Sequence, residues 1–370
     1  MIEVDVVVVG AGAMGSATAW RLARQGRSVA LLERFGPGHD RGSSHGSTRI
    51  FRVAYRDARY VHLAVRALPL WRELEDAAGE VLLEQDGQLD HGHAAAIEEI
   101  AGHLEGTGHP AQVLRPDQAT ERWPGMRFDE AVVFSPEGGR CYADRTVAAC
   151  QRLAAAAGAE VRFHTPVERI EPARSGDSVT VHTADGPWRA PVAVVAAGAW
   201  VQPLLAGVDG VRLPPVVVES DQPSHFRPYD PDAPWPAFLH HMAVDGSADH
   251  PLAFHAYGLS SPGEGVKVGG YGTVVPDDAE DRGGISAART AEQVGYVQRW
   301  LPGLDPTPVS TTSCLFTTTP DEHFVLDRRG PVVVCSPCSG HGFKFVPAIA
   351  DEVAALVAGE SQREPAWRLR

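Results

Sequence analysis

A glycine-rich turn between two apolar segments constrains the fold of this chain more than any other feature. Gly10-Ala-Gly12-Ala-Met-Gly15 directly follows Val4–Val9, a β-branched run that is typical of a buried parallel strand. Apolar residues then recur at helical spacing from Ser16 to Gln25, and Gly26 follows as a helix-terminating residue. The pattern predicts a strand, a tight turn and a helix.

The next segment, Ser28–Leu32, predicts a second buried strand, so the N-terminus reads as a βαβ unit. In such a unit the first glycine allows the tight turn, the second lets the backbone approach a pyrophosphate, and the third lets the helix pack on the strand. Glu33 closes the second strand, where a carboxylate can accept hydrogen bonds from a ribose diol and disfavours a 2′-phosphate. These features predict a dinucleotide site and leave FAD and NAD as alternatives.

A length of 370 residues predicts two domains or one large fold with an insertion. Both ends of the chain have α/β patterns, whereas residues 203–310 contain many prolines and glycines among short alternating runs. We therefore expect a mixed α/β fold, with a dinucleotide-binding domain and an inserted antiparallel-sheet substrate domain. The expected ranges are 1–80, 145–205 and 320–370 for the first domain, and 81–144 and 206–319 for the second. Helices are predicted at Arg59–Ala77, Val147–Ala157, Ala287–Trp300 and Val346–Ala358.

Composition and charge exclude several classes of protein. The chain is 44% hydrophobic and 22% charged, which excludes disorder and a coiled coil. A net charge of −14 argues against binding to nucleic acid or to an anionic membrane surface. Five cysteines, no basic leader and a glycine-punctuated stretch at Val6–Trp20, too short to span a bilayer, predict a cytoplasmic protein. A monomer or a weak homo-oligomer is expected.

The basic residues have an unusual composition. Of the 33 lysines and arginines, only Lys267 and Lys344 are lysines. Such a bias indicates a general drift towards arginine. The two positions that have kept lysine are therefore candidates for a function that arginine cannot perform. Lys344 lies among glycine and phenylalanine just after a buried strand, Val332–Cys335, which is an unusual place for a surface lysine.

Three further segments carry polar residues in a suggestive order. Ser43-Ser-His-Gly-Ser-Thr-Arg-Ile-Phe-Arg52 follows the βαβ unit, and a helical turn there would bring Arg49 and Arg52 to one side. The second segment runs from Thr312 to Asp327, and the third is Cys338-Ser-Gly-His-Gly-Phe-Lys-Phe. Cys335-x-x-Cys338 allows a redox interpretation, but two ordinary buried cysteines are the favoured one, and no metal site is expected.

Together these segments resemble the monomeric sarcosine oxidase and N-methyltryptophan oxidase family of flavoprotein amine oxidases. The motifs GAGAMG, SSHGSTRIFRVAY, SCLFTTTPDEHFVLD and CSGHGFKF occur in the family's order from residue 4 to about 360. The resemblance implies FAD, held covalently through Cys314, and an amine substrate with O2 as its partners. Lys267, in Gly265-Val-Lys-Val-Gly269, matches the family lysine that activates O2, and Lys344 matches a lysine that binds the substrate carboxylate.

The resemblance also implies the remaining site residues. The catalytic group would comprise Lys267, Arg49, His45 and Tyr271, and the substrate-binding group Arg52, Lys344 and Tyr257. The residues expected to contact the cofactor are Gly10, Gly12, Ala13, Met14, Gly15, Glu33, Arg34, Ser43, Thr48, Val167, Gly198, Cys314, Gly340, His341, Gly342 and Lys344.

Two departures from the family pattern concern the substrate. Gly270-Tyr271 stands where the family often has a histidine, and a tyrosine-centred segment appears only as Tyr257-Gly-Leu-Ser. The expected activity is oxidation of a secondary amine, an N-methyl or cyclic amino acid, to an imine with formation of H2O2. A primary or D-amino-acid oxidase, an amine dehydrogenase that does not use O2, and a non-catalytic flavin-binding protein are the alternatives.

Overall fold

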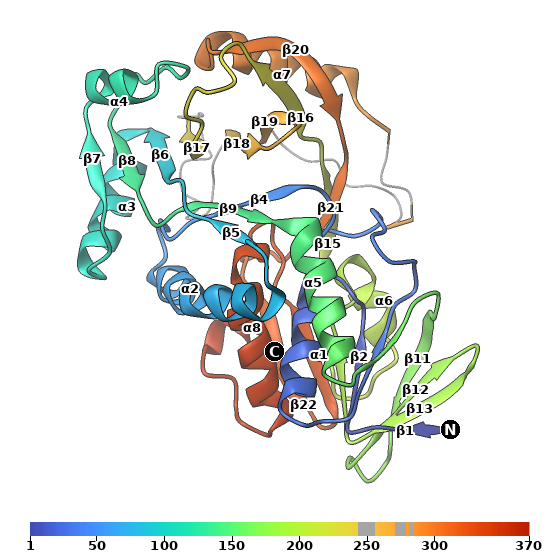
Figure 1. Ribbon diagram of the computed structural model, residues 1–370. Coiled ribbons are helices and arrows are strands. Elements are labelled where there is room, and N and C mark those ends of the chain that lie inside the picture. The colour runs from blue at the N-terminus through green and yellow to red at the C-terminus, as the bar shows by residue number, and fades with distance from the viewer. Residues whose placement is uncertain (243–255, 271–278, 281–283, 370) are drawn as a thin grey trace.

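The computed structural model describes residues 1–242, 256–270, 279–280 and 284–369 (Figure 1). A six-stranded sheet lies in the lower half of that view, with the strand order β10-β3-β2-β14-β23-β22. Five of its strands are parallel and β22 is antiparallel to β23. The strands are β10 (Glu160–Arg162), β3 (Val29–Leu32), β2 (Val6–Val9), β14 (Val192–Val195), β23 (Val332–Ser336) and β22 (Val325–Arg329).

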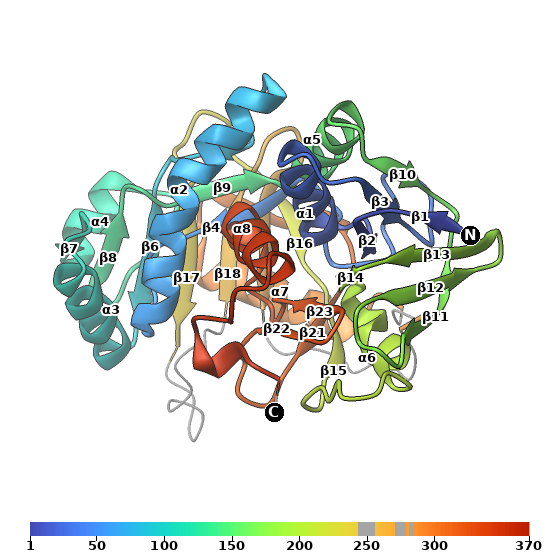
Figure 2. The same ribbon diagram turned by 90° about the horizontal axis from the view of Figure 1, so that it is seen from below.

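Both faces of this sheet are covered, which explains why its strands are apolar without interruption. Val6 and Val8 of β2 pack in a core with helices, whereas Val7 and Val9 pack in a second core with a four-stranded sheet, as the alternation of side chains along a strand requires. On the helical face α1 packs between α5 and α8, and α2 packs on α8 (Figure 2). These helices are α1 (Ala13–Arg24), α2 (Ala58–Ala78), α5 (Ala143–Ala156) and α8 (Val346–Val357).

The four-stranded sheet on the other face has the order β1-β13-β12-β11. Trp188 and Val181 from this sheet are buried against Val7 and Val195 of the six-stranded sheet. The short helix α6 (Val201–Leu205) contributes Val201 to the same core. The strands are β1 (Ile2–Glu3), β11 (Val167–Pro172), β12 (Val179–Thr183) and β13 (Gly186–Ala190).

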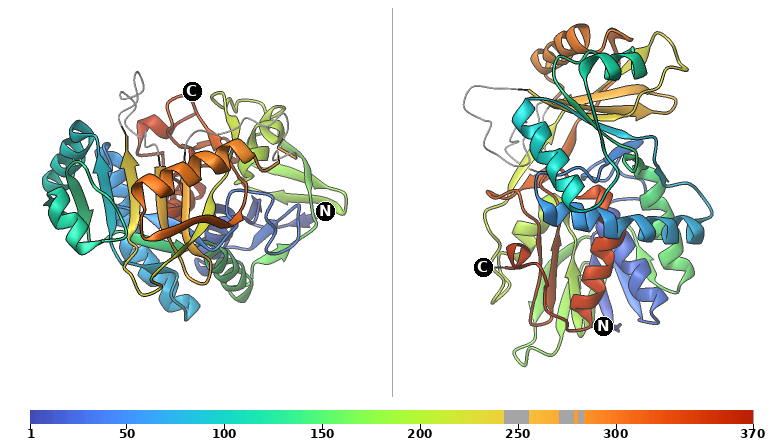
Figure 3. Two further views of the ribbon diagram at one scale, coloured as in Figure 1. Left: turned by 90° about the horizontal axis from the view of Figure 1, so that it is seen from above. Right: turned by 90° about the vertical axis from the view of Figure 1, so that its left-hand side faces the viewer.

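An eight-stranded sheet forms the upper half of Figure 1, in the order β20-β16-β19-β18-β17-β6-β8-β7. The expected antiparallel arrangement holds except between β17 and β6, which are parallel. Helix α7 packs Tyr296 and Val297 on this sheet, and Figure 3 shows the helix lying over its outer side. The elements are β6 (Gln88–Gly92), β7 (Gln112–Leu114), β8 (Val132–Ser135), β16 (Ser224–Pro228), β17 (Ala237–His241), β18 (Ala256–Ser261), β19 (Gly265–Gly270), β20 (Leu304–Thr311), α3 (Ala94–Gly106), α4 (Pro116–Arg122) and α7 (Ala287–Trp300).

Two small sheets lie between the large ones (Figure 1). One has the order β4-β9-β5, and the other is the antiparallel pair β15-β21. The strands are β4 (Thr48–Phe51), β5 (Leu83–Glu84), β9 (Gly139–Tyr142), β15 (Val217–Asp221) and β21 (Cys314–Thr318), and the short 3-10 helices are η1 (Gly198–Trp200), η2 (Phe343–Phe345) and η3 (Pro365–Trp367).

Most predicted elements are confirmed within a few residues; the first helix, for example, begins at Ala13 rather than Ser16, because Gly12 is its N-cap and Gly15 is already helical. One local prediction is wrong. Arg49 lies in β4, so Arg49 and Arg52 do not share a helical turn; strand pairing with β9 overrides the local spacing. The division into two domains stays a prediction. Across the described ranges, no helix is both long and apolar enough to span a membrane.

Candidate active site

A cavity of about 820 Å³ brings the predicted residues together. Its walls come from the β2–α1 turn, the β3–β4 loop, β18, β19, β21 and the segment before α8. Tyr271 lies outside the described residues, and Gly15 does not line the cavity. All the other predicted site residues do: Gly10, Gly12, Ala13, Met14, Glu33, Arg34, Ser43, His45, Thr48, Arg49, Arg52, Val167, Gly198, Tyr257, Lys267, Cys314, Gly340, His341, Gly342 and Lys344.

The glycine turn forms a cradle that side chains would fill. Gly10 has a φ of +97°, and a Cβ there would lie 2.5 Å from the carbonyl oxygen of Ala196. A Cβ on Gly15 would lie 1.8 Å from the carbonyl oxygen of Gly10, so this glycine allows the helix to pack closely on the turn. The turn therefore presents bare backbone and a helix N-terminus to the cavity, which is the arrangement that binds a pyrophosphate.

Glu33 is held in place as an acceptor. Its carboxylate accepts hydrogen bonds from the backbone N–H groups of Ala11, at 2.7 Å, and Phe35, at 2.9 Å. Burial acts to raise the pKa of Glu33, but hydrogen bonds from His39 and these two N–H groups outweigh it and lower the pKa. An ionised carboxylate beside the glycine cradle fits the ribose diol of a dinucleotide.

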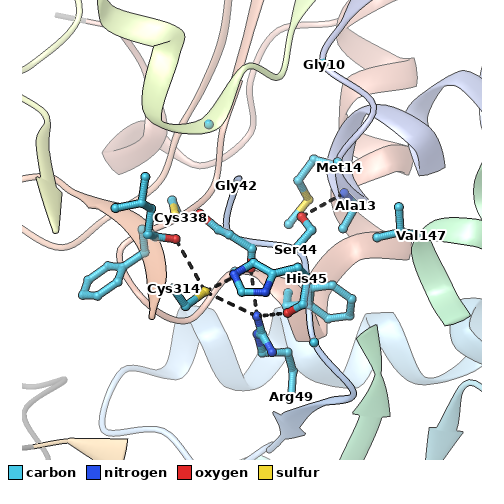
Figure 4. Close-up of a pocket in the computed structure, with 18 of the residues that line it drawn as sticks. Gly10, Ala13, Met14, Gly42, Ser44, His45, Arg49, Val147, Cys314 and Cys338 are labelled. Carbon is cyan, nitrogen blue, oxygen red and sulfur yellow. Dashed lines mark hydrogen bonds between the residues drawn. The ribbon is translucent and has the colours of Figure 1, made fainter. Parts of the chain in front are cut away.

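The loop before β4 is anchored to the start of α1. Ser44 Oγ accepts a hydrogen bond of 3.1 Å from the backbone N–H of Ala13 (Figure 4). No sequence pattern indicated this contact, because it depends on the path of the loop. Arg49 in turn donates to the carbonyl oxygens of Ser43, at 3.0 Å, and His45, at 2.6 Å. This arginine therefore fixes the loop that forms one wall of the cavity.

Cys314 lies at the same wall. Its Sγ is 3.5 Å from Nη2 of Arg49, as Figure 4 shows. Burial raises the pKa of the Cys314 thiol, and the nearby Arg49 opposes that shift. Cys335 and Cys338 also line the cavity, and Cys338 Sγ accepts a hydrogen bond from the backbone N–H of Thr317 at 3.2 Å. Both are free thiols; Cys335 is buried as predicted, whereas Cys338 is only partly buried.

Two buried cations converge on one aromatic ring. The guanidinium carbon of Arg52 is 3.8 Å from the ring centre of Tyr55, and Nζ of Lys344 is 5.7 Å from it. The side chains donate to the backbone carbonyl oxygens of Ala54 and His341, respectively. Burial, and secondarily Arg52, holds the pKa of Lys344 well below its usual value. Neither cation forms an ion pair with a carboxylate in the part of the chain that the structure describes, so both are available to an anionic ligand.

Lys267 reaches the cavity from β19. Its buried Nζ donates to the carbonyl oxygen of Thr48 at 3.0 Å. Burial, assisted by the charge of Arg49, lowers the pKa of Lys267 to about 7. A lysine in this environment changes its charge near neutral pH, which an arginine cannot do.

Tyr257 belongs to β18, and its ring lies against Gly269 of the neighbouring strand β19. A Cβ on Gly269 would be 2.4 Å from the ring and hydroxyl of Tyr257, so this glycine makes room for the aromatic side chain. The hydroxyl donates to Oδ2 of Asp221 at 2.7 Å. Asp221 also lines the cavity, and no sequence pattern indicated it, because only the pairing of β15 with β21 brings it there. Within the described ranges, no group of three or more His, Cys, Asp and Glu side chains could hold a metal ion.

Comparison with known proteins agrees with this geometry. The profile of the DAO family, described as FAD dependent oxidoreductase, matches residues 5–356. The chain is 34% identical to a monomeric sarcosine oxidase of Bacillus sp. (strain NS-129), over 95% of this chain and 92% of the relative. It is 29% identical to an N-methyl-L-tryptophan oxidase of Yersinia pestis (strain Pestoides F), over 96% and 95%, respectively.

A solved structure extends the similarity to three dimensions. The open form of NikD, an amino acid oxidase of nikkomycin biosynthesis, superimposes with a TM-score of 0.87 at 28% identity, covering 100% of this chain and 98% of that one. The glycine cradle, the ionised Glu33 and the cavity beyond them fit FAD. The chain therefore belongs to the family of FAD-dependent oxidoreductases and is an enzyme of that class.

Proposed function

We propose that this enzyme oxidises a secondary amine that carries a carboxylate, an N-methyl or cyclic amino acid, and transfers the electrons to O2. The observation that carries this proposal is the pair of buried cations, Arg52 and Lys344, which face the same cavity as the dinucleotide cradle. A desolvated carboxylate is the ligand that such a pair suits. The names of the relatives, sarcosine oxidase and N-methyl-L-tryptophan oxidase, support an N-methyl amino acid.

In this proposal the chain orients the substrate and FAD does the redox chemistry. Gly10, Gly12 and Glu33 hold the dinucleotide part of the cofactor, and Arg52 and Lys344 bind the substrate carboxylate. Bound FAD supplies a hydride acceptor that passes two electrons on to O2 and yields H2O2. The oxidised substrate is an imine, which water hydrolyses to an aldehyde or keto acid and an amine.

Lys267 is proposed to serve the step in which O2 is reduced. Reduction of O2 builds up negative charge, which a preorganised cation stabilises. The buried amino group of Lys267 carries a positive charge below its pKa of about 7, and it approaches from β19, whereas Lys344 approaches from the segment that precedes α8. The two lysines would thus act in different halves of the reaction.

Covalent attachment of FAD through Cys314 is a further part of the proposal. A thioether requires a thiolate, and Arg49 is the cation beside the Cys314 sulfur. A cytoplasmic location, and a monomeric or weakly homo-oligomeric state, stay predictions from the sequence.

The test is anaerobic mixing of the purified yellow enzyme with sarcosine, N-methyl-L-tryptophan, L-proline, glycine and D-alanine. We expect the secondary amines to bleach the flavin absorbance, and air to restore it with one H2O2 for each amine consumed. Faster bleaching by glycine or D-alanine would indicate a primary-amine oxidase. Bleaching without H2O2 on aeration would indicate a dehydrogenase, and no bleaching by any of the five would contradict the proposed substrate class.

A further inference from the structure

Asp221 lines the cavity, and the proposed function gives its carboxyl group no role. Asp221 is the last residue of β15 and is paired with Cys314 of β21 in antiparallel register. Side chains of directly paired residues lie on the same face of a sheet, about 5 Å apart at Cβ. Asp221 therefore lies beside Cys314 in the wall of the cavity. Its carboxyl group is partly accessible from the cavity and is otherwise surrounded by protein.

The hydrogen bonds of Asp221 orient Tyr257. Oδ1 accepts from the backbone N–H of Gln222 at 2.7 Å, and Oδ2 accepts from the hydroxyl of Tyr257 at 2.7 Å. Because Gly269 leaves room for the tyrosine ring, the ring lies close against β19. Tyr257 lines the cavity and directs its own proton at Asp221, and a hydroxyl oxygen that donates one hydrogen bond can also accept one.

An amine substrate brings such a donor. A secondary amine is mostly an ammonium ion at neutral pH, since alkylamines have pKa values of about 10. An ammonium has no free lone pair to assist loss of a hydride from the neighbouring carbon, so one proton must leave first. Transfer of that proton to a carboxylate converts two buried charges into two neutral groups, which a desolvated site favours.

The charged and titratable groups around Asp221 permit this transfer. Tyr257 faces it from β18, Arg49 from β4, Arg289 from α7, and Cys314 from β21. Burial raises the pKa of Asp221, whereas the hydrogen bonds from Tyr257 and Gln222 and the two arginines oppose the rise. Arg52 and Lys344, at the proposed carboxylate site, also disfavour a nearby ammonium.

We propose that Asp221 accepts the proton of the substrate ammonium through the hydroxyl of Tyr257. The ammonium N–H bond breaks and a new O–H bond forms on Tyr257, while the original hydroxyl proton moves to Oδ2 of Asp221. The lone pair stays on nitrogen, no electrons are exchanged, and the products are a neutral amine and a neutral carboxylic acid. Tyr257 touches the substrate, and Asp221 is a positioning residue that acts through it. This inference depends on the proposed oxidation of amines.

The experiment measures anaerobic flavin reduction by sarcosine at low concentration as a function of pH, by stopped flow. The wild-type enzyme can use the ammonium form of sarcosine. The second-order rate constant for flavin reduction should therefore change less than about threefold from pH 7 to pH 9. In Asp221→Asn only the free amine in solution can react, so the constant should fall about tenfold for each pH unit below the pKa of sarcosine. Tyr257→Phe should show the same slope, and Asp221→Glu should restore the flat profile.

Glu219→Gln provides the matched control. Glu219 lies two residues earlier on β15 and bonds the hydroxyl of Thr318, and it does not line the cavity. Its profile should follow that of the wild type. If Asp221→Asn loses activity by the same factor at every pH, or if Tyr257→Phe keeps the flat wild-type profile, the proposed transfer is wrong. If the wild-type flavin is not reduced by any amine, the proposed function has failed rather than the role of Asp221.

Discussion

Replacing Lys344 with methionine isolates one of the two cations that are proposed to bind the substrate carboxylate. Methionine keeps the length and apolar contacts of the side chain but removes the ammonium group. Nζ of Lys344 is buried and donates only to the carbonyl oxygen of His341 among the described residues, so the substitution breaks no ion pair there. The fold should also be kept because the carbonyl oxygen of Lys344, which accepts from Trp71 Nε1 at 2.8 Å, is main chain.

The expected loss follows from two opposing effects. Removing one partner of a desolvated charge pair costs roughly 2–4 kcal/mol. In the free protein, however, burial and then the charge of Arg52 hold the pKa of Lys344 well below its usual value, so part of the gain on binding is spent on keeping this lysine protonated. The net loss should therefore lie near the lower end, about 2 kcal/mol, which corresponds to roughly a 30-fold rise in Kd.

The assay titrates the FAD-loaded enzyme with propionate and follows the flavin absorbance spectrum. Propionamide, which has nearly the same shape but no charge, serves as the ligand control and should bind equally to the wild type and the variant. Lys267→Met is the matched protein control, because it removes the other lysine of the chain and should leave propionate binding within about twofold. An unchanged propionate Kd in Lys344→Met would refute the assigned carboxylate site.

Three further predictions concern the remaining parts of the site. Cys314→Ser should release FAD into the supernatant after acid denaturation, whereas the wild-type pellet should stay yellow and its intact mass should include one FAD; free flavin from the wild type would contradict the covalent bond. Lys267→Met should be reduced by sarcosine at the normal rate under anaerobic conditions but should reoxidise in air about 10²–10³-fold more slowly, measured by stopped flow, and a normal reoxidation rate would remove its proposed role. Lys267 should also affect the stability of the apoprotein, because its folded-state pKa of about 7 lies below the usual value for lysine. Between pH 7 and 10.5 the unfolded state therefore binds one proton more than the folded state. The free energy of unfolding should then rise with pH, by up to about 1.4 kcal/mol per pH unit. Denaturant unfolding of Lys267→Met should lack that part of the slope, and equal slopes in both proteins would show that the folded-state pKa is not depressed.

The local parts of the structure could be predicted from the sequence. A continuous β-branched run, three spaced glycines and a helical pattern are short-range signals, and they correctly predict β2, the turn and α1. The helix predicted at Ala287–Trp300 has these bounds in the structure, and Glu33 forms the contacts that suit a ribose acceptor. Backbone sterics and side-chain periodicity decide such features within about 30 residues of chain.

Only the tertiary structure decided which side chains meet in the cavity. Arg52 and Lys344 approach the ring of Tyr55 from segments far apart in the chain, and Asp221 reaches Tyr257 because β15 pairs with β21. Strand register depends on burial of a whole face, and a shift by one residue would turn Asp221 away from the cavity. No local pattern in the sequence specifies strand register. For this reason the spacing of Arg49 and Arg52 wrongly predicted a helical turn, and nothing in the sequence indicated Asp221.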